Sequence, residues 1–113
     1  MTYNEGSKFP TRMGYIVERI EDWHHDRNLI EGATDKDQLA KLIQEVGELS
    51  DNICKGQDIR DDIGDIIVVL INIAVRNKVT LEECMQIAYD DIKNRKGKMA
   101  VSYTHLRAHE TRI

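Results

Sequence analysis

The apolar run from Ile66 to Val75 constrains the fold of this 113-residue chain more than any other feature. β-Branched residues dominate the run, so it could form either a buried strand or a helix. We favour a helix, because the sequence offers no second strand and an isolated strand would leave its backbone groups unpaired. The run is apolar on all sides and is interrupted only by Asn72, a candidate for a buried, hydrogen-bonded residue at a helix contact. Such a helix needs several packing neighbours, most simply a second copy of the chain.

Apolar residues at helical spacing predict an all-α fold of four main helices. Local chemistry sets their boundaries, because hydroxyl and carboxylate side chains cap helix N-termini and glycine favours C-termini. The predicted elements are Arg12 to Ile30, a helix capped by Thr34 or Asp35 that ends near Gly56, a helix capped by Asp58 that ends at Asn77 and Lys78, and a helix begun by a capping box of Thr80 and Glu83.

The chain divides into a lead-in, one domain and a tail. Residues 1–11 are polar, carry the only proline and predict a flexible lead-in, whereas residues 12–99 predict one helical domain. Residues 101–111 resemble the in-frame translation of an adapter used in sequencing libraries, which suggests read-through in a phage or metagenomic contig. We therefore treat residues 100–113 as a non-native tail and give His105 and His109 no metal-binding role.

Charge and composition exclude some partners. The formal net charge is -4, which argues against a general grip on a nucleic-acid polymer, since that grip needs many cationic side chains. The run from Ile66 to Val75 is too short to span a bilayer, and the first thirty residues lack the apolar core of a signal peptide. We expect a cytoplasmic protein without a membrane partner.

Two carboxylate pairs stand close to the middle of the chain. Glu45 and Glu48 are three residues apart, and so are Asp62 and Asp65, so each pair shares one face of its helix. If the four carboxylates converge, their repulsion must be balanced by protons or cations, and Mg²⁺ is the natural partner of oxygen ligands. The alternative for either pair alone is a solvated helix surface.

Glycine lies inside each carboxylate motif. Gly47 and Gly64 each cost a helix about 1 kcal/mol relative to alanine, so each should serve a purpose. Close approach of two backbones and room for a ligand are both reasonable explanations.

Longer strings around these pairs resemble a known family. Lys-Leu-Ile-Gln-Glu-Val-Gly-Glu-Leu from Lys41 to Leu49 and Asp-Asp-Ile-Gly-Asp from Asp61 to Asp65 resemble the MazG-like all-α nucleotide pyrophosphohydrolases, whose signature is Glu-x-x-Glu followed by Glu-x-x-Asp on the next helix. The stretch 23–33 is similar to the end of the first helix in phage-type members, and 92–98 to their phosphate-binding helix end. The resemblance covers roughly residues 12–99.

The resemblance implies an activity and a cofactor. Family members hydrolyse a nucleoside triphosphate between the α and β phosphates, giving a monophosphate and pyrophosphate. Carboxylates hold Mg²⁺, for which Mn²⁺ is a possible substitute, and a water oriented by the metal or by a carboxylate attacks the α phosphorus. The implied metal ligands are Glu45, Glu48, Asp62 and Asp65, of which Glu45 or Glu48 could instead orient the water. Asp62 departs from the family pattern, where glutamate is usual, so the number of metal ions is in doubt.

Further residues are candidates for binding the nucleotide. Trp23 could stack on a base, with Asn28 or His24 reading the edge of that base, although a lone tryptophan on an apolar stripe could equally be a core residue. Lys41 could bind a phosphate or form a plain ion pair with Glu45, one turn away. The basic end of the fourth helix could bind the triphosphate, or could simply complement the helix dipole. Its candidate residues are Lys93, Asn94, Arg95 and Lys96.

Our leading interpretation is a Mg²⁺-dependent pyrophosphohydrolase that acts on nucleoside or deoxynucleoside triphosphates, cleans the nucleotide pool and assembles as a homodimer or homotetramer. A phosphoribosyl-ATP pyrophosphohydrolase would share the fold and the chemistry. Two other classes stay open, namely an idle regulatory module that binds nucleotide and metal, and a structural helical dimer with solvated acidic faces.

Overall fold

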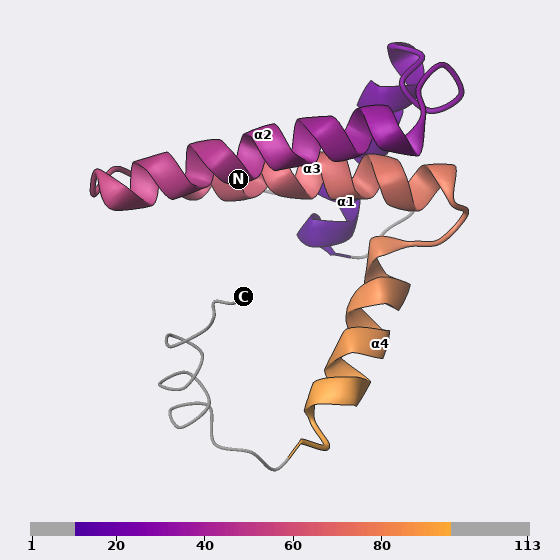
Figure 1. Cartoon of the computed structure of the whole chain (residues 1–113). Coiled ribbons are helices and arrows are strands. Elements are labelled where there is room, and N and C mark those ends of the chain that lie inside the picture. The colour runs from indigo at the N-terminus through magenta and orange to yellow at the C-terminus, as the bar shows by residue number, and fades with distance from the viewer. Residues whose placement is uncertain (1–10, 96–113) are drawn as a thin grey trace. The chain divides into compact units, whose positions relative to one another are not determined.

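A computed structural model describes residues 11–95 and contains four helices in that range, with no strand among the described residues. The helices are α1 (Arg12–Asp26), α2 (Asp35–Cys54), α3 (Arg60–Arg76) and α4 (Leu81–Ile92) (Figure 1). The predicted all-α fold is therefore confirmed. Most of the lead-in and the whole predicted tail lie outside the described residues. The described residues form two compact units, which meet in sequence between Glu83 and Cys84.

Helix α1 ends earlier than the sequence suggested. Thr11 caps its start, where the side-chain oxygen accepts a hydrogen bond from the Gly14 amide at 3.0 Å. The predicted extension to Ile30 is wrong, because Asn28 takes a left-handed conformation with φ of 56°. A Cβ on Gly32 would lie 2.5 Å from the Asn28 carbonyl oxygen, so the chain can turn here only with glycine at this position.

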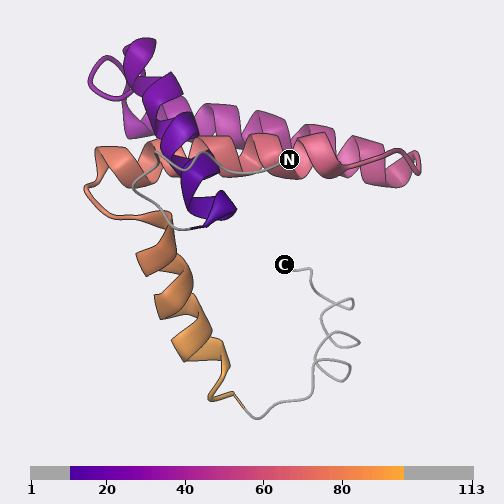
Figure 2. The same cartoon turned by 180° about the vertical axis from the view of Figure 1, so that it is seen from behind.

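Helices α2 and α3 form an antiparallel hairpin, and α1 packs across α3 (Figures 1 and 2). The predicted start of α2 is confirmed by a reciprocal capping box of Thr34 and Asp37, and its end by Gly56, which has φ of 69°. The N-cap position of α3 is Ile59 rather than Asp58, although the Asp58 carboxylate still accepts a hydrogen bond from the Arg60 amide at 3.0 Å. The strand alternative for residues 66–75 is excluded, since all of them lie in α3.

A buried polar contact joins α1 to α3. His24 is 2% exposed and its Nε2 lies 2.9 Å from the Val68 carbonyl oxygen, which can only accept, so Nε2 carries the proton. Asn72 is fully buried, and its amide nitrogen donates to the Leu29 carbonyl at 2.9 Å and faces His24 Nδ1 at 3.3 Å. The prediction of a buried Asn72 at a helix contact is confirmed. The suggestion that His24 reads a base edge is wrong, because both of its ring nitrogens are engaged in the core.

Replacement of Asn72 by alanine should lower the free energy of unfolding by about 2–4 kcal/mol, since it leaves buried acceptors unpaired and opens a cavity. Chemical denaturation followed by circular dichroism measures this loss. The control is Asn94→Ala at an exposed position, which should change the unfolding free energy by less than about 0.5 kcal/mol. Equal effects of the two substitutions would contradict a structural role for the buried amide.

The hairpin has two unlike faces. Successive residues of an α-helix are rotated by about 100° about the helix axis. On α2, Glu48 therefore lies about 60° from the buried Glu45 in one rotational direction, and Val46 lies about 100° from Glu45 in the other. Asp65 and Ile63 stand in the same relation to the buried Asp62 on α3. Because the helices are antiparallel, this shared order puts the carboxylates on one face of the hairpin, the face that α1 also contacts.

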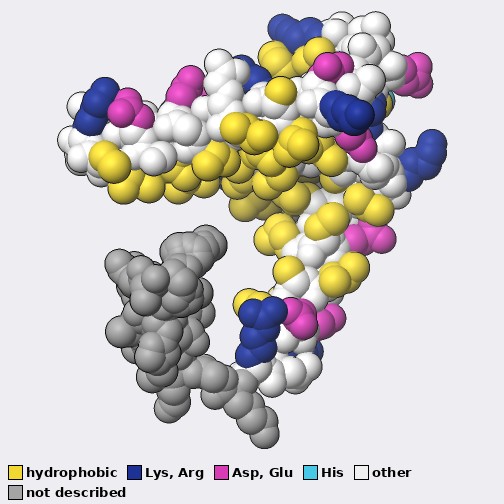
Figure 3. All heavy atoms as spheres, in the orientation of Figure 1, with side chains coloured by type: hydrophobic (Ala, Val, Ile, Leu, Met, Phe, Trp, Pro, Cys, Tyr) yellow, Lys and Arg dark blue, Asp and Glu magenta, His cyan; other side chains and the backbone are white. Residues whose placement is uncertain are grey.

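The opposite side of the hairpin, here called the apolar face, is exposed. Figure 3 shows apolar side chains gathered along α2 and α3. The large apolar residues of this face are between 37% and 65% exposed, and they are Leu39, Ile43, Val46, Ile53, Ile63, Ile67 and Leu70. No helix within residues 11–95 is both long and apolar enough to cross a membrane.

Helix α4 begins as the sequence predicted. The Thr80 side chain accepts a hydrogen bond from the Glu83 amide at 3.0 Å, and the Glu83 carboxylate accepts one from the Thr80 amide at 2.8 Å. This reciprocal pair is the predicted capping box, so the start of the fourth helix is confirmed.

Candidate functional site

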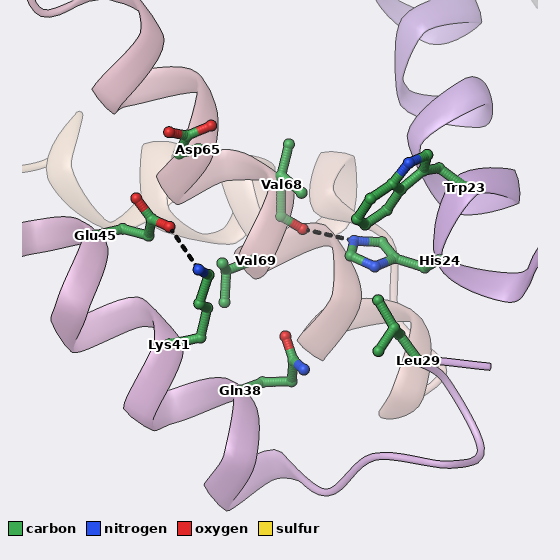
Figure 4. Close-up of a pocket in the computed structure, with 9 residues that line it drawn as sticks. All are labelled: Trp23, His24, Leu29, Gln38, Lys41, Glu45, Asp65, Val68 and Val69. Carbon is green, nitrogen blue, oxygen red and sulfur yellow. Dashed lines mark hydrogen bonds and ion pairs between the residues drawn. The ribbon is translucent and has the colours of Figure 1, made fainter. Parts of the chain in front are cut away.

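A pocket of about 280 Å³ opens between α1, α2 and α3 on the carboxylate face of the hairpin. This volume is at the low end of the roughly 300–1,000 Å³ that is typical of small-molecule sites, so the pocket suits one part of a nucleotide rather than the whole. Figure 4 shows Glu45 on α2 and Asp65 on α3 lying close to one another in it. The lining residues are Trp23, His24, Leu29, Gln38, Lys41, Glu45, Asp65, Val68 and Val69.

Glu45 is the buried carboxylate of the pocket. It is 7% exposed, and its Oε2 lies 3.2 Å from Nζ of Lys41, one turn earlier on α2. Its Oε1 is buried and has no hydrogen-bond partner. A buried carboxylate oxygen without a partner is costly, so Glu45 is suited to accept a further cation or hydrogen-bond donor.

Asp65 faces Glu45 from the other helix of the hairpin and is partly buried. Its pKa is raised, chiefly by desolvation and further by the negative charges of Asp61, Glu45 and Asp62, whereas Lys41 lowers it. A carboxylate with a raised pKa in a pocket is typical of functional sites. The carboxylate of Asp65 therefore interacts electrostatically with acidic residues of both α2 and α3.

The remaining predicted metal ligands lie less centrally. Asp62 is 6% exposed, and its Oδ2 accepts a hydrogen bond from Asn52 Nδ2 at 2.9 Å. Glu48 is exposed and does not line the pocket. Sequence reasoning missed Asn52, which stands one helical turn beyond Glu48 and could have been found from that spacing.

The donor set fits a hard divalent cation in its chemistry. The four predicted ligands offer only carboxylate oxygens, and one buried oxygen of Glu45 has no partner. Within residues 11–95, however, no three His, Cys, Asp or Glu side chains stand together in a position to hold a metal ion. Ligation by Glu45, Glu48, Asp62 and Asp65 therefore requires side-chain rotations and stays a prediction.

Trp23 lies at the rim of the pocket and is 44% exposed, so the alternative of a core tryptophan is wrong. The Arg27 guanidinium carbon lies 4.4 Å from the centroid of the Trp23 ring, and the His24 ring meets the indole edge-on at 5.2 Å. The sequence analysis missed Arg27, although its i+4 spacing from Trp23 places the two side chains on one face of α1. Trp23 stays a candidate for stacking on a base.

Asn28 does not line the pocket, and its left-handed backbone gives it a structural reason to be asparagine. Its predicted role in base recognition is untested.

The basic end of α4 belongs to the second compact unit, whereas the pocket residues belong to the first. Lys93 pairs with Asp90 at 3.0 Å and Arg95 with Asp91 at 2.6 Å, while the Asn94 amide donates to the Asp90 carbonyl. Lys96 lies outside the described residues. Binding of phosphate by this helix end stays a prediction.

The two glycines of the carboxylate motifs do not serve close packing. A Cβ placed on Gly47 or Gly64 would meet no atom within 4 Å. Among the described residues, the explanation by close backbone approach is therefore wrong, whereas room for a ligand stays a prediction.

Comparisons with known proteins assign the chain to a family. Residues 33–100 match the model of the MazG nucleotide pyrophosphohydrolase domain, a region that includes both carboxylate pairs. The chain is 39% identical over 66 residues to an uncharacterized 18.2 kDa protein of the rep-hol intergenic region of Haemophilus phage HP1, a match that covers 57% of this chain and 40% of the phage protein. No solved structure matches the chain. Since the family model spans more than half of its residues, this chain belongs to the MazG nucleotide pyrophosphohydrolase domain family.

Proposed function

We propose that this chain hydrolyses a nucleoside or deoxynucleoside triphosphate to the monophosphate and pyrophosphate, with Mg²⁺ or, as a substitute, Mn²⁺. The family supports the reaction class. The observation that carries the proposal is the partnerless buried oxygen of Glu45, which faces Asp65 across the pocket. The proposed role is housekeeping of the nucleotide pool in the cytoplasm.

Carboxylates from both helices of the hairpin would hold the cation. The proposed ligands are Glu45, Glu48, Asp62 and Asp65, and the bound cation would supply neutralisation of phosphate charge. Asp62 is the least available of them, because Asn52 already binds one of its oxygens.

The reaction needs one water molecule and one proton acceptor. The water oxygen forms a bond to the α phosphorus while the bond from that phosphorus to the α–β bridging oxygen breaks, and pyrophosphate leaves with the bridging oxygen. Instead of binding the cation, Glu48 could orient this water and take its proton, since its carboxylate is exposed one turn beyond Glu45. The exposed indole of Trp23 would hold the base, and Lys41 would contact a phosphate.

The apolar face supports the proposed homodimer or homotetramer. Seven large apolar side chains on one side of the hairpin are more than a small domain usually leaves in water. A second copy offers the same face, so two copies could cover each other by a two-fold arrangement.

Pyrophosphate release from a panel of nucleoside triphosphates, with and without Mg²⁺, tests the activity. We expect Mg²⁺-dependent release, and we expect Glu48→Gln to reduce kcat by about 100-fold or more, within the usual range for loss of a general base. The matched control is Glu82→Gln, at an exposed position in the first turn of α4, which should keep wild-type turnover.

Nucleotide binding without any turnover would exclude the enzyme and favour an idle binding module. Turnover of phosphoribosyl-ATP alone would identify the related pyrophosphohydrolase. Unchanged turnover in Glu48→Gln would contradict the role of Glu48 while leaving the activity itself intact.

A further inference from the structure

Lys41 brings a single positive charge to the carboxylates of the pocket. Its Nζ lies 3.2 Å from Oε2 of Glu45, and its side chain is 52% exposed whereas that of Glu45 is 9% exposed. Figure 4 shows Lys41 reaching Glu45 from the turn before it on α2, with Asp65 beyond. The ammonium group is thus the solvent-accessible partner and the carboxylate the buried one.

One ammonium group does not neutralise the negative charge of the carboxylates in and around this pocket. Oε1 of Glu45 keeps no hydrogen-bond partner, and the negative charges around Asp65 include Asp61, Asp62 and Glu45. A divalent cation brings twice the charge and accepts several oxygen ligands at once, so it neutralises such a group better than an ammonium does. Lys41 can leave without breaking the fold, because its long stem is half exposed and flexible.

We propose that Lys41 is an exchangeable counter-ion of Glu45. Its ammonium pairs with Oε2 of Glu45. A divalent cation held by the same carboxylate would replace this pairing, and the ammonium would then be free to bind a phosphate oxygen of the substrate. This inference rests on the proposed function of the same pocket. It unites the two roles that the sequence left open for Lys41, since ion pairing and phosphate binding become successive states of one side chain.

Titration of the full chain with Mn²⁺ or Mg²⁺ alone, by calorimetry, tests the exchange. In Lys41→Met the cation no longer competes with an ammonium, so its affinity should rise by roughly fivefold, the scale of a partly exposed ion pair. Lys41→Arg keeps the charge and should bind the cation as the wild type does.

Lys55→Met is the matched control for the change in net charge. Lys55 and Asp51 form an ion pair of the same spacing on the same helix, 2.9 Å apart, but both side chains are exposed. Lys55 lies about 21 Å from Lys41 and about 15 Å from Glu45 along the axis of α2, beyond the range of unscreened charges at physiological salt. Its cation affinity should equal that of the wild type.

Thermal stability and polyphosphate binding give two further tests of the exchange. Without divalent ions, Lys41→Met should melt about 5 °C below the wild type, because Glu45 keeps a buried charge without a partner. With saturating Mg²⁺, the same variant should bind inorganic tripolyphosphate roughly fivefold more weakly, because it lacks the freed ammonium. Opposite changes in affinity for cation and for polyphosphate distinguish an exchanging lysine from a purely structural one.

The outcomes separate the inference from the proposed function. If the wild type binds the cation and hydrolyses triphosphates but Lys41→Met binds the cation no more tightly, the exchange is wrong and the function stands. Tighter cation binding with unchanged tripolyphosphate binding would overturn the second half of the proposal. A wild-type chain that binds neither Mn²⁺ nor Mg²⁺ would overturn both.

Discussion

Asp65→Asn is expected to lower kcat/KM for triphosphate hydrolysis by at least about 100-fold and, at the same time, to make the metal-free protein more stable at pH 7. The loss of activity follows because asparagine offers a cation a neutral oxygen in place of a charged one. The gain in stability follows because Asp65 is held in a partly desolvated position among Asp61, Glu45 and Asp62, a setting that raises its pKa. Removing the charge removes this unfavourable interaction in the folded state.

The pH dependence has a definite sign. Between the ordinary aspartate pKa, about 3.9, and the raised pKa of folded Asp65, the folded chain binds more protons at this position than the unfolded chain does. The free energy of unfolding of the wild type therefore falls as the pH rises through this window. Asp65→Asn should not show this decrease, because asparagine does not ionise. The difference in unfolding free energy between variant and wild type should be near zero below the window and constant above it.

Thermal unfolding in the presence of a chelator measures the stability, and pyrophosphate release measures the activity. Asp51→Asn is the control, because Asp51 is exposed and pairs with Lys55, so its loss should not raise the melting temperature. Added Mg²⁺ should stabilise the wild type and leave Asp65→Asn nearly unchanged, since the cation stabilises only the state that binds it. If Asp65→Asn is both less stable than the wild type and fully active, the proposed role of Asp65 in the site is wrong.

The sequence was informative wherever structure depends on local chemistry. The start of α2, predicted at Thr34 or Asp35, its end at Gly56 and the capping box of Thr80 and Glu83 involve neighbours within a few residues, and all three predictions are confirmed. The end of α1 was missed because Ile30 continues the helical spacing of apolar residues although the chain has already turned at Asn28. Apolar spacing marks which residues prefer burial, but it does not mark where a backbone leaves the helix.

The environments of adjacent residues were harder to predict. Trp23 and His24 are neighbours, yet the larger and more apolar side chain lies at the rim of the pocket and the imidazole lies in the core. The reason is tertiary, because Val68 and Asn72 present polar groups to α1 that a histidine can satisfy and a tryptophan cannot. Similarly, the spacing within each carboxylate pair predicted a shared helix face, and the spacing of Lys41 and Glu45 allowed for their ion pair. The burial of Glu45 and its partnerless Oε1 emerge only once both helices are packed.

Ile43→Glu is expected to prevent the proposed self-association and to leave a folded monomer. Ile43 is 65% exposed on the apolar face, so a charge there should cost the isolated chain little, whereas burial of that charge between two copies would be strongly unfavourable. We expect the association constant to fall by at least about 100-fold, the equivalent of roughly 2.7 kcal/mol. Sedimentation velocity at micromolar concentration measures the assembly, and circular dichroism verifies that the helices persist.

Gln44→Glu is the matched control, since it adds the same charge to the same helix at the next position, about 100° away from Ile43 and outside the apolar face. It should leave the assembly as the wild type has it. A wild-type chain that sediments as a monomer at these concentrations would contradict the proposed oligomer. If Ile43→Glu is monomeric and still hydrolyses triphosphate, each copy holds a complete site. If the monomer is inactive although Mn²⁺ still binds, the active site is one that two copies complete together.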